Sequence, residues 1–169
     1  MSKASIVAHI RDILILPFTV TVIVPYLIHD SQHGWIPESI FFTSFGVLIG
    51  SGGLLLFLYT VLLFKNIGQG TLAPWSEKHK LVVVGPYRYC RNPMITGVLF
   101  ILIGEAFFLY SNPILVWAIC FFIINTVYFV ISEEPKLEKK FGEDYRLYKQ
   151  HVSRWIPRFS PYRQRSSDG

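Results

Sequence analysis

Residues 39–64 read SIFFTSFGVLIGSGGLLLFLYTVLLF, a run that contains no Asp, Glu, Lys, Arg or His. A helix that crosses the roughly 30 Å hydrocarbon core of a bilayer needs about 20 mostly apolar residues, and this run is long enough. Gly46 and Gly50 stand four residues apart within it, a spacing of small residues that lets a second helix approach closely. The run therefore predicts a membrane-spanning helix with a glycine-lined contact face.

Three further apolar segments accompany this run, at residues 13–28, 94–110 and 113–131. The first contains Pro17 and Pro25, which each remove a backbone donor and predict a kinked helix. The last two segments are separated by two residues only and predict a tight antiparallel hairpin. We therefore expect an all-α membrane protein with about four transmembrane helices, the last two forming a C-terminal helical hairpin.

The composition supports a membrane class. Of the 169 residues, 51% are hydrophobic and 16% are charged, whereas charged residues make up about 25% of a soluble domain. The two cysteines, Cys90 and Cys120, lie far apart in different settings, so we expect neither a disulfide nor a metal site. The excess of basic residues is expected to face anionic lipid headgroups rather than nucleic acid.

The positions of the basic residues predict the topology. All 16 Lys and Arg residues fall in residues 1–12, 65–93 or 132–169, and the connections at 29–38 and 111–112 hold none. With four spans these three segments share one side, which the positive-inside rule assigns to the cytoplasm. We expect both termini in the cytoplasm. The predicted domains are residues 1–64, the N-terminal transmembrane helices, and residues 65–169, a cytoplasmic loop, the hairpin and a tail.

The tail carries a helical pattern of apolar and aromatic residues. Spacings of three and four residues recur at Glu133, Glu134, Leu137, Phe141, Tyr145, Tyr148 and Val152. They predict a cytoplasmic amphipathic tail helix that is interrupted at Gly142 and ends at Pro157. Periodicity alone leaves open whether its aromatic face lies in the headgroup layer or belongs to a functional site.

Two stretches identify a family. Residues 85–97 read GPYRYCRNPMITG, and residues 133–142 read EEPKLEKKFG, followed by Tyr145, Tyr148 and RWIP at 154–157. In this order around a membrane hairpin they resemble the isoprenylcysteine carboxyl methyltransferase and phospholipid methyltransferase superfamily. The lead-in GTLAPW at 70–75 is similar to that of bacterial-type members. The resemblance covers roughly residues 68–157 and implies the bacterial inner membrane.

The resemblance implies a methyltransferase that uses S-adenosylmethionine, and it assigns site residues. Arg91 and Glu133 are the residues expected to be catalytic, and Glu133 is also the expected cofactor-binding glutamate. Anchoring of Arg88 and Arg91 to lipid phosphates is the equal alternative to catalysis by Arg91. The remaining cofactor-binding positions fall in two groups on either side of Arg91: His79, Lys80, Leu81, Val82 and Tyr87, then Asn92, Pro93, Met94 and Ile95. No metal is implied.

The chemistry of the cofactor agrees with these assignments. Its sulfonium and ammonium favour a nearby carboxylate, its carboxylate favours donors, and its adenine favours apolar or aromatic walls. Glu133 supplies the carboxylate, His79 a donor, and Tyr87 an aromatic wall. Pro93 suits the first turn of the third span, because the missing N–H of a proline costs nothing there.

Two positions depart from the family pattern and bear on the acceptor. Ile95 stands where the family's motif has tyrosine, and Phe129 stands where prenylcysteine enzymes have a substrate-binding arginine. Without that arginine an acceptor carboxylate lacks its partner. We therefore expect a small-molecule or lipophilic acceptor, such as a thiol or a phospholipid amine. An NADPH-dependent membrane reductase of related architecture and a non-enzymatic membrane scaffold remain the alternatives.

Overall fold

The computed structural model describes residues 15–29, 35–67, 81 and 83–163, and its secondary structure in these ranges is entirely helical. The segment Ile15–Ile28 contains a π-helical turn, η1. A 3-10 turn, η2, precedes the α4–α5 pair, and a second π-helical turn, η3, follows it. In chain order the elements are η1 (Thr19–Ile23), α2 (Val24–Ile28), α3 (Ile40–Ile67), η2 (Gly85–Arg88), α4 (Pro93–Phe108), α5 (Asn112–Tyr128), η3 (Phe129–Glu133), α6 (Glu134–Phe141) and α7 (Glu143–His151).

The chain divides into two compact units. The first consists of Met1–Leu58 and Ile95–Thr126, and the second of Tyr59–Met94 and Val127–Gly169. Both motif stretches lie largely in the second unit. The predicted domains, residues 1–64 and 65–169, stay a prediction.

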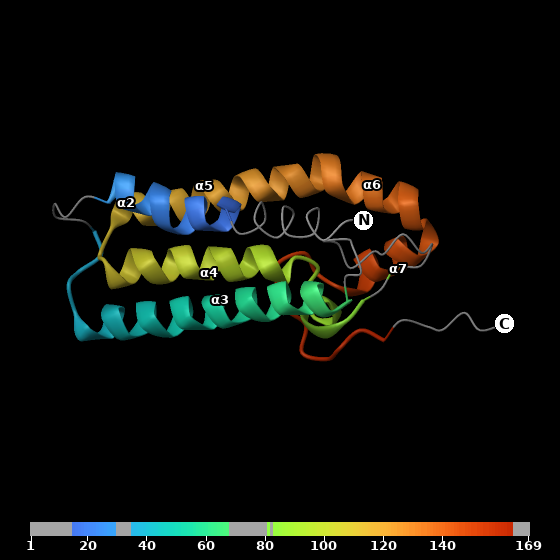
Figure 1. Ribbon diagram of the computed structural model, residues 1–169, viewed down its shortest axis with the longest axis horizontal. Coiled ribbons are helices and arrows are strands. Elements are labelled where there is room, and N and C mark those ends of the chain that lie inside the picture. Colours follow the sequence, from blue (N-terminus) through green and yellow to red (C-terminus); the bar gives the residue numbers. More distant parts are fainter. Residues whose placement is uncertain (1–14, 30–34, 68–80, 82, 164–169) are drawn as a thin grey trace. The chain divides into compact units, whose positions relative to one another are not determined.

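In the first unit, α3 and α4 pack closely through glycines (Figure 1). A Cβ atom added at Gly46 would lie 2.7 Å from the carbonyl oxygen of Gly104, and one at Gly53 would lie 2.7 Å from that of Gly97. A Cβ at Gly50 would make ordinary contact with Gly104, at 3.5 Å. The two helix backbones therefore touch, and the close approach predicted at Gly46 and Gly50 is confirmed.

The hairpin of α4 and α5 completes the first unit. The helices run antiparallel in Figure 1 and are joined at Tyr110, which adopts a positive φ of 51°. The amide of Ser111 donates to the carbonyl of Ala106 across the turn (2.9 Å). Beside α5, the indole Nε1 of Trp117 donates to the carbonyl of Val20 (3.1 Å), which ties α5 to η1.

Two helical segments are long and apolar enough to cross a membrane, Ile40–Leu63 and Asn112–Phe141. Only 22% and 17% of their apolar windows are buried inside the protein, so most of that apolar surface faces outward. The apolar helices Ile15–Ile28 and Pro93–Phe108 are shorter. The long apolar helices agree with an all-α membrane protein, whereas the count of four spans stays a prediction.

Each π-helical turn stands just before a proline. In η1 the amide of Val24 donates to the carbonyl of Thr19, and in η3 the amide of Glu134 donates to the carbonyl of Phe129. The next residues are Pro25 and Pro135, which have no N–H for the regular bond to the residue four before them. The wider π-helical turn accommodates the proline. It also rotates the residues after the turn about the helix axis, so that their side chains point in a different direction.

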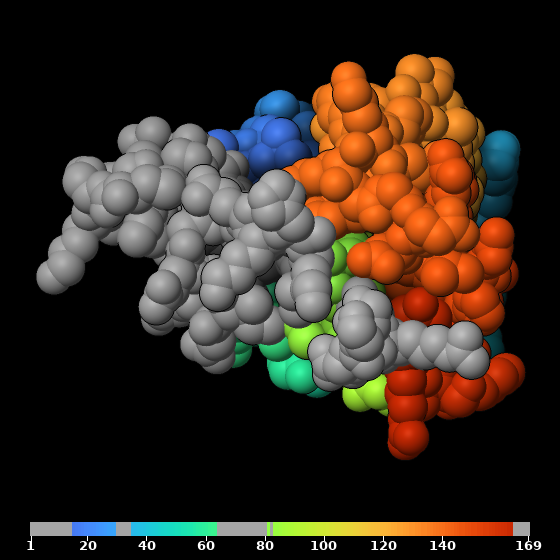
Figure 2. All heavy atoms as spheres, turned by 90° about the vertical axis from the view of Figure 1, so that its right-hand side faces the viewer, coloured from blue at the N-terminus to red at the C-terminus, as the bar shows by residue number. Residues whose placement is uncertain are grey.

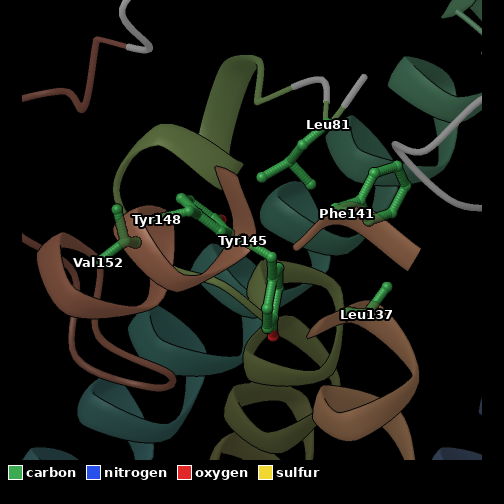
Figure 3. Close-up of a cluster of buried hydrophobic side chains, with 6 residues drawn as sticks. All are labelled: Leu81, Leu137, Phe141, Tyr145, Tyr148 and Val152. Atoms are coloured by element: carbon green, nitrogen blue, oxygen red, sulfur yellow. The ribbon is translucent and has the colours of Figure 1, made fainter. Parts of the chain in front are cut away.

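The second unit is built around a small apolar core. Figure 3 shows six side chains converging: Leu81, Leu137, Phe141, Tyr145, Tyr148 and Val152. The surfaces of α6 and α7 adjoin in Figure 2, in orange and red-orange. Gly142 separates these two helices and has a φ of 56°. The sequence predicted an interruption of the helical pattern at this residue. The aromatic face of the tail therefore packs against the protein's own Leu81.

The end of α7 differs from the prediction. The helix ends at His151, and Val152 is extended, so the helix stops six residues before Pro157. The reason lies in long-range hydrogen bonding, because the chain after Val152 turns to run along residues 88–91.

Candidate functional site

The first motif begins in a 3-10 turn, η2. Gly85 starts it with a φ of 53°, a backbone conformation that glycine adopts without strain. A Cβ atom there would also meet the side chain of Leu63 at 3.0 Å. Pro86 occupies the first turn, where its missing N–H costs nothing. The turn buries the ring of Tyr87 in the second unit.

Backbone hydrogen bonds fasten the tail to this motif. The amide of Arg91 donates to the carbonyl of Ser153, and the amide of Arg158 donates to that of Tyr89, each over 3.0 Å. The Sγ of Cys90 donates to the carbonyl of Arg154 (3.1 Å). The residues after α7 thus run beside the end of the first motif and hold it in place.

A buried carboxylate joins the two motifs. Oε1 of Glu134 accepts hydrogen bonds from Nη1 of Arg91 (3.0 Å) and Nε of Arg154 (2.7 Å), and Oε2 lies 3.2 Å from Nζ of Lys149. The side chain of Glu134 is 5% exposed and that of Arg91 is 9% exposed. We name these four residues the Glu134 cluster. Because a buried charge is costly without partners, the cluster fixes Arg91 relative to α6 and the tail.

The cluster holds more positive than negative charge. Glu134 faces three cationic side chains, and among the described residues only Lys149 gains a second carboxylate, that of Glu138 at 2.7 Å. Nε of Arg91 is buried and has no hydrogen-bond partner within the described ranges. An unpaired buried donor on a charged group is unfavourable by itself. It is the kind of atom that a bound anionic group would satisfy.

Tyrosines surround this charge. Nη1 of Arg91 also lies 3.4 Å from the hydroxyl of Tyr145. The hydroxyl of Tyr148 donates to the carbonyl of Tyr87 over 2.7 Å. Burial raises the pKa of the Tyr148 phenol, so it keeps its proton and this bond fixes the η2 turn against α7.

The neighbouring glutamate has a different environment. Glu133 ends η3, is half-buried, and accepts a hydrogen bond from the hydroxyl of Tyr128 (3.3 Å). Within the second unit the structure thus brings Arg91 to Glu134 rather than to Glu133. A carboxylate that is half-buried and has one neutral partner remains open to a ligand.

An aromatic pair takes the place that the family pattern gives to arginine. The ring of Phe129 meets that of Trp155 edge-on, with centroids 6.0 Å apart. Trp155 lies on the tail segment that follows α7. This part of the second unit is therefore apolar, where an arginine would have offered charge.

The other sequence-predicted site residues are distributed as follows. Leu81 lies in the apolar core of the second unit, Pro93 begins α4 fully buried, and Asn92 and Met94 are half-buried beside it. Ile95 belongs to the first unit. His79, Lys80 and Val82 fall outside the described residues. The roles of all these residues stay predictions.

Sequence reasoning placed Glu134 and Arg154 in the family motif and Lys149 among the basic residues of the tail, and it did not predict the Glu134 cluster. One signal was present, because Glu134 stands three residues before Leu137 and seven before Phe141, on the buried face of the tail helix. The partners of Glu134 come from long-range contacts that spacing does not reveal.

Within the described ranges, no group of three or more His, Cys, Asp or Glu side chains is placed to hold a metal ion. The residues do fit S-adenosylmethionine in chemical type. Arg91 offers an unpaired buried donor for a carboxylate, and Glu133 offers a carboxylate for a cationic group.

Comparison with known proteins gives the family. A family model described as phospholipid methyltransferase matches residues 42–144. An uncharacterized protein of Haemophilus influenzae (strain ATCC 51907 / DSM 11121 / KW20 / Rd) is 35% identical over 63 residues, which are 37% of this chain and all of that protein. No solved structure matches. Since the family match spans more than half of the sequence, and both motif stretches fall largely within it, the chain belongs to the phospholipid methyltransferase family.

Proposed function

We propose that this protein is an integral membrane methyltransferase that moves a methyl group from S-adenosylmethionine to a small or lipid-like acceptor at the cytoplasmic face. The observation that carries the proposal is the family membership together with the Glu134 cluster, in which Arg91 of the first motif meets Glu134 of the second at 3.0 Å. Residues 43 positions apart in sequence are thereby held in one compact unit.

The cofactor-binding residues are proposed on chemical grounds. Bound S-adenosylmethionine supplies an activated methyl carbon on a sulfonium, which a nucleophile takes by in-line displacement. Glu133 offers its carboxylate to the cationic end, and Nε of Arg91 offers a donor to the carboxylate. Tyr87 and Leu81 offer aromatic and apolar surface. His79, Lys80, Val82, Asn92, Pro93, Met94 and Ile95 complete the proposed set.

The chain's contribution to the reaction is positioning. Methyl transfer needs the nucleophile and the methyl carbon close and in line, away from competing water, and such orientation supplies a large part of a rate enhancement. The Glu134 cluster holds Arg91 through its ion pair with Glu134, which is itself held by Arg154 and Lys149. Glu134 is therefore proposed as a positioning residue, while Arg91 and Glu133 are proposed as the catalytic residues.

The aromatic pair favours an acceptor without a carboxylate. Phe129 stands four residues before Glu133, and its ring packs edge-on against that of Trp155, so the two rings offer apolar surface. A neutral thiol, an amine or another lipid-soluble nucleophile suits such surroundings better than an anion does. The outward-facing apolar helices support delivery of such an acceptor from the bilayer.

Calorimetry of the purified protein in detergent tests the cofactor assignment. S-adenosylmethionine and S-adenosylhomocysteine are expected to bind and NADPH is not. Glu133→Ala should weaken adenosyl binding about tenfold or more, the loss expected for a hydrogen bond to a charged group. Glu143→Ala is the matched control, because Glu143 is a 70% exposed carboxylate on α7 and its removal should change nothing.

Each other outcome has a clear meaning. Binding of NADPH without the adenosyl ligands would favour a membrane reductase. No binding of the three ligands by a folded sample would favour a scaffold. If Glu133→Ala and Glu143→Ala change the affinity for the adenosyl ligands equally, the assignment of Glu133 to the cofactor site is wrong.

A further inference from the structure

A second feature of the second unit lies outside the proposed catalytic residues. A cavity of about 420 Å³ is lined by Val83, Val84, Gly85, Arg88, Tyr162 and Arg163. Its volume is in the range of small-molecule sites, roughly 300–1,000 Å³, and exceeds what a single inorganic ion needs. Among the described residues, its lining includes two arginines and no carboxylate.

Reciprocal hydrogen bonds hold this cavity in shape. The amide of Tyr162 donates to the carbonyl of Arg88, and Nε of Arg88 donates to the carbonyl of Tyr162, each over 2.9 Å. The ring of Tyr162 packs against Tyr148 and His151, with centroids 5.7 and 5.8 Å apart. One wall of the cavity is thus anchored to α7.

Between the described residues, no ion pair neutralises the cationic groups of this cavity. The ion pairs between described residues engage Arg91, Arg146, Lys149 and Arg154, and none of them includes Arg88 or Arg163. The Nε bond of Arg88 leaves its two terminal nitrogens as donors. The guanidinium of Arg88, anchored through Nε, and that of Arg163 carry planar donors that match the geometry of phosphate oxygens.

The tail segment that ends in this cavity also exposes large apolar side chains. Ile156 is 76% exposed and Phe159 is fully exposed. Tyr162 and Arg163 follow on the same segment. A segment that carries exposed apolar side chains together with Arg163 suits an amphiphile. The chains of an amphiphile favour apolar surface, and its phosphate favours guanidinium groups.

From these observations we infer that the Arg88–Arg163 cavity binds the phosphate group of an anionic amphiphile, of which an anionic phospholipid is the simplest source. The site is distinct from the proposed catalytic residues Arg91 and Glu133. The inference does not rest on methyl transfer, and free phosphate esters share the same recognising chemistry.

The test measures binding of dihexanoyl phosphatidylglycerol, kept below its micelle concentration, to the full chain in detergent by thermophoresis. Arg163→Gln and Arg88→Gln are each expected to weaken binding about tenfold, which corresponds to about 1.4 kcal/mol. Arg163 is exposed, so its variant should fold normally. Arg146→Gln is the matched control, because Arg146 is a 63% exposed arginine on α7 and its loss removes the same charge elsewhere.

Two further arms identify the source of the phosphate. Glycerol 3-phosphate and inorganic phosphate are titrated against the same variants. Binding of the lipid alone supports a headgroup site, and binding of the soluble phosphates, weakened by Arg163→Gln, supports a phosphate-ester site.

The inference is overturned if none of these phosphates binds, or if Arg146→Gln weakens binding as much as Arg163→Gln does. It is also overturned if Arg163→Gln abolishes binding of S-adenosylmethionine, because the cavity would then belong to the cofactor site. In either of the first two cases the cofactor titration remains informative about methyl transfer.

Discussion

At the residue scale, Glu134 is the side chain on which the second unit most depends. Glu134→Gln keeps the shape but leaves three cations facing a neutral group. Breaking a buried ion pair costs about 3–5 kcal/mol, and the partial exposure of Arg154 and Lys149 favours the lower end. We expect a lower midpoint of thermal unfolding, measured in detergent.

The control for this prediction is Glu143→Gln, which breaks an exposed pair with Arg146. Such pairs contribute about 0–1 kcal/mol. Equal midpoints for the Glu134 and Glu143 variants would contradict a structural role for the cluster.

The two adjacent glutamates also show how far sequence reasoning reaches at a single residue. The motif predicted a functional region at 133–134 and named Glu133 as its cofactor-binding carboxylate. Which of the two carboxylates is buried depends on the π-helical turn before them and on Arg91, 43 positions earlier in the chain. Neither the turn nor the partner is visible in local periodicity.

At the scale of elements, the contact of α3 with α4 depends on the absence of side chains. Gly53→Ala would place a Cβ 2.7 Å from the Gly97 carbonyl and 2.7 Å from Cβ of Phe100. Such overpacking costs about 1–3 kcal/mol, so the variant should unfold at a lower denaturant concentration.

Gly52→Ala is the neighbouring control, because a Cβ there would meet nothing within 4 Å. Alanine favours a helix by about 1 kcal/mol over glycine, so this variant should be neutral or more stable. A destabilised Gly52→Ala with an unaffected Gly53→Ala would contradict the packing.

The π-helical turn η3 offers a second test at this scale. Pro135→Ala restores an N–H that can donate to the carbonyl four residues earlier, which allows a regular helix and turns Glu133 and Glu134 away from their present neighbours. We expect weaker binding of S-adenosylmethionine by calorimetry.

Pro25→Ala is the matched control, since Pro25 follows the η1 turn of the first unit in the same way. It should leave cofactor binding unchanged. Unaltered binding in Pro135→Ala, with the protein folded, would show that the turn does not position the site.

Helix positions were the most predictable elements, for a physical reason. The run at 39–64 corresponds to Ile40–Ile67 and the run at 94–110 to Pro93–Phe108, because apolar stretches bounded by polar residues define buried or lipid-facing helices. The fourth run was predicted to end at Ile131, yet helical structure continues through η3 and α6 to Phe141. The apolar run ends at Ile131, but the residues that follow it still favour a helix.

At the scale of the whole molecule, the distribution of basic residues predicts that both termini face the cytoplasm. A fluorescent reporter fused after Gly169 should fold and fluoresce in bacterial cells, whereas alkaline phosphatase fused there should stay inactive, because it matures only in the periplasm. The opposite pattern would contradict the positive-inside assignment and the proposed cytoplasmic site.

The same scale shows what sequence patterns leave undetermined. The two motifs predicted the family, which the match over residues 42–144 confirms. They did not predict that residues 153–162 run along residues 88–91, or that Arg88 and Arg163 line one cavity. Backbone pairing between distant irregular segments has no periodic signature.

The central claim is methyl transfer from S-adenosylmethionine, and the most direct measurement follows the methyl group itself. The protein is reconstituted in lipid vesicles from a bacterial extract and incubated with S-adenosylmethionine labelled in the methyl group. We expect a labelled product, either organic-extractable or a small molecule, together with an equal amount of S-adenosylhomocysteine. Both should be sharply reduced in Glu133→Ala and retained in Glu143→Ala. Methyl transfer would be contradicted if folded protein gave no more S-adenosylhomocysteine and no more labelled product than empty vesicles do.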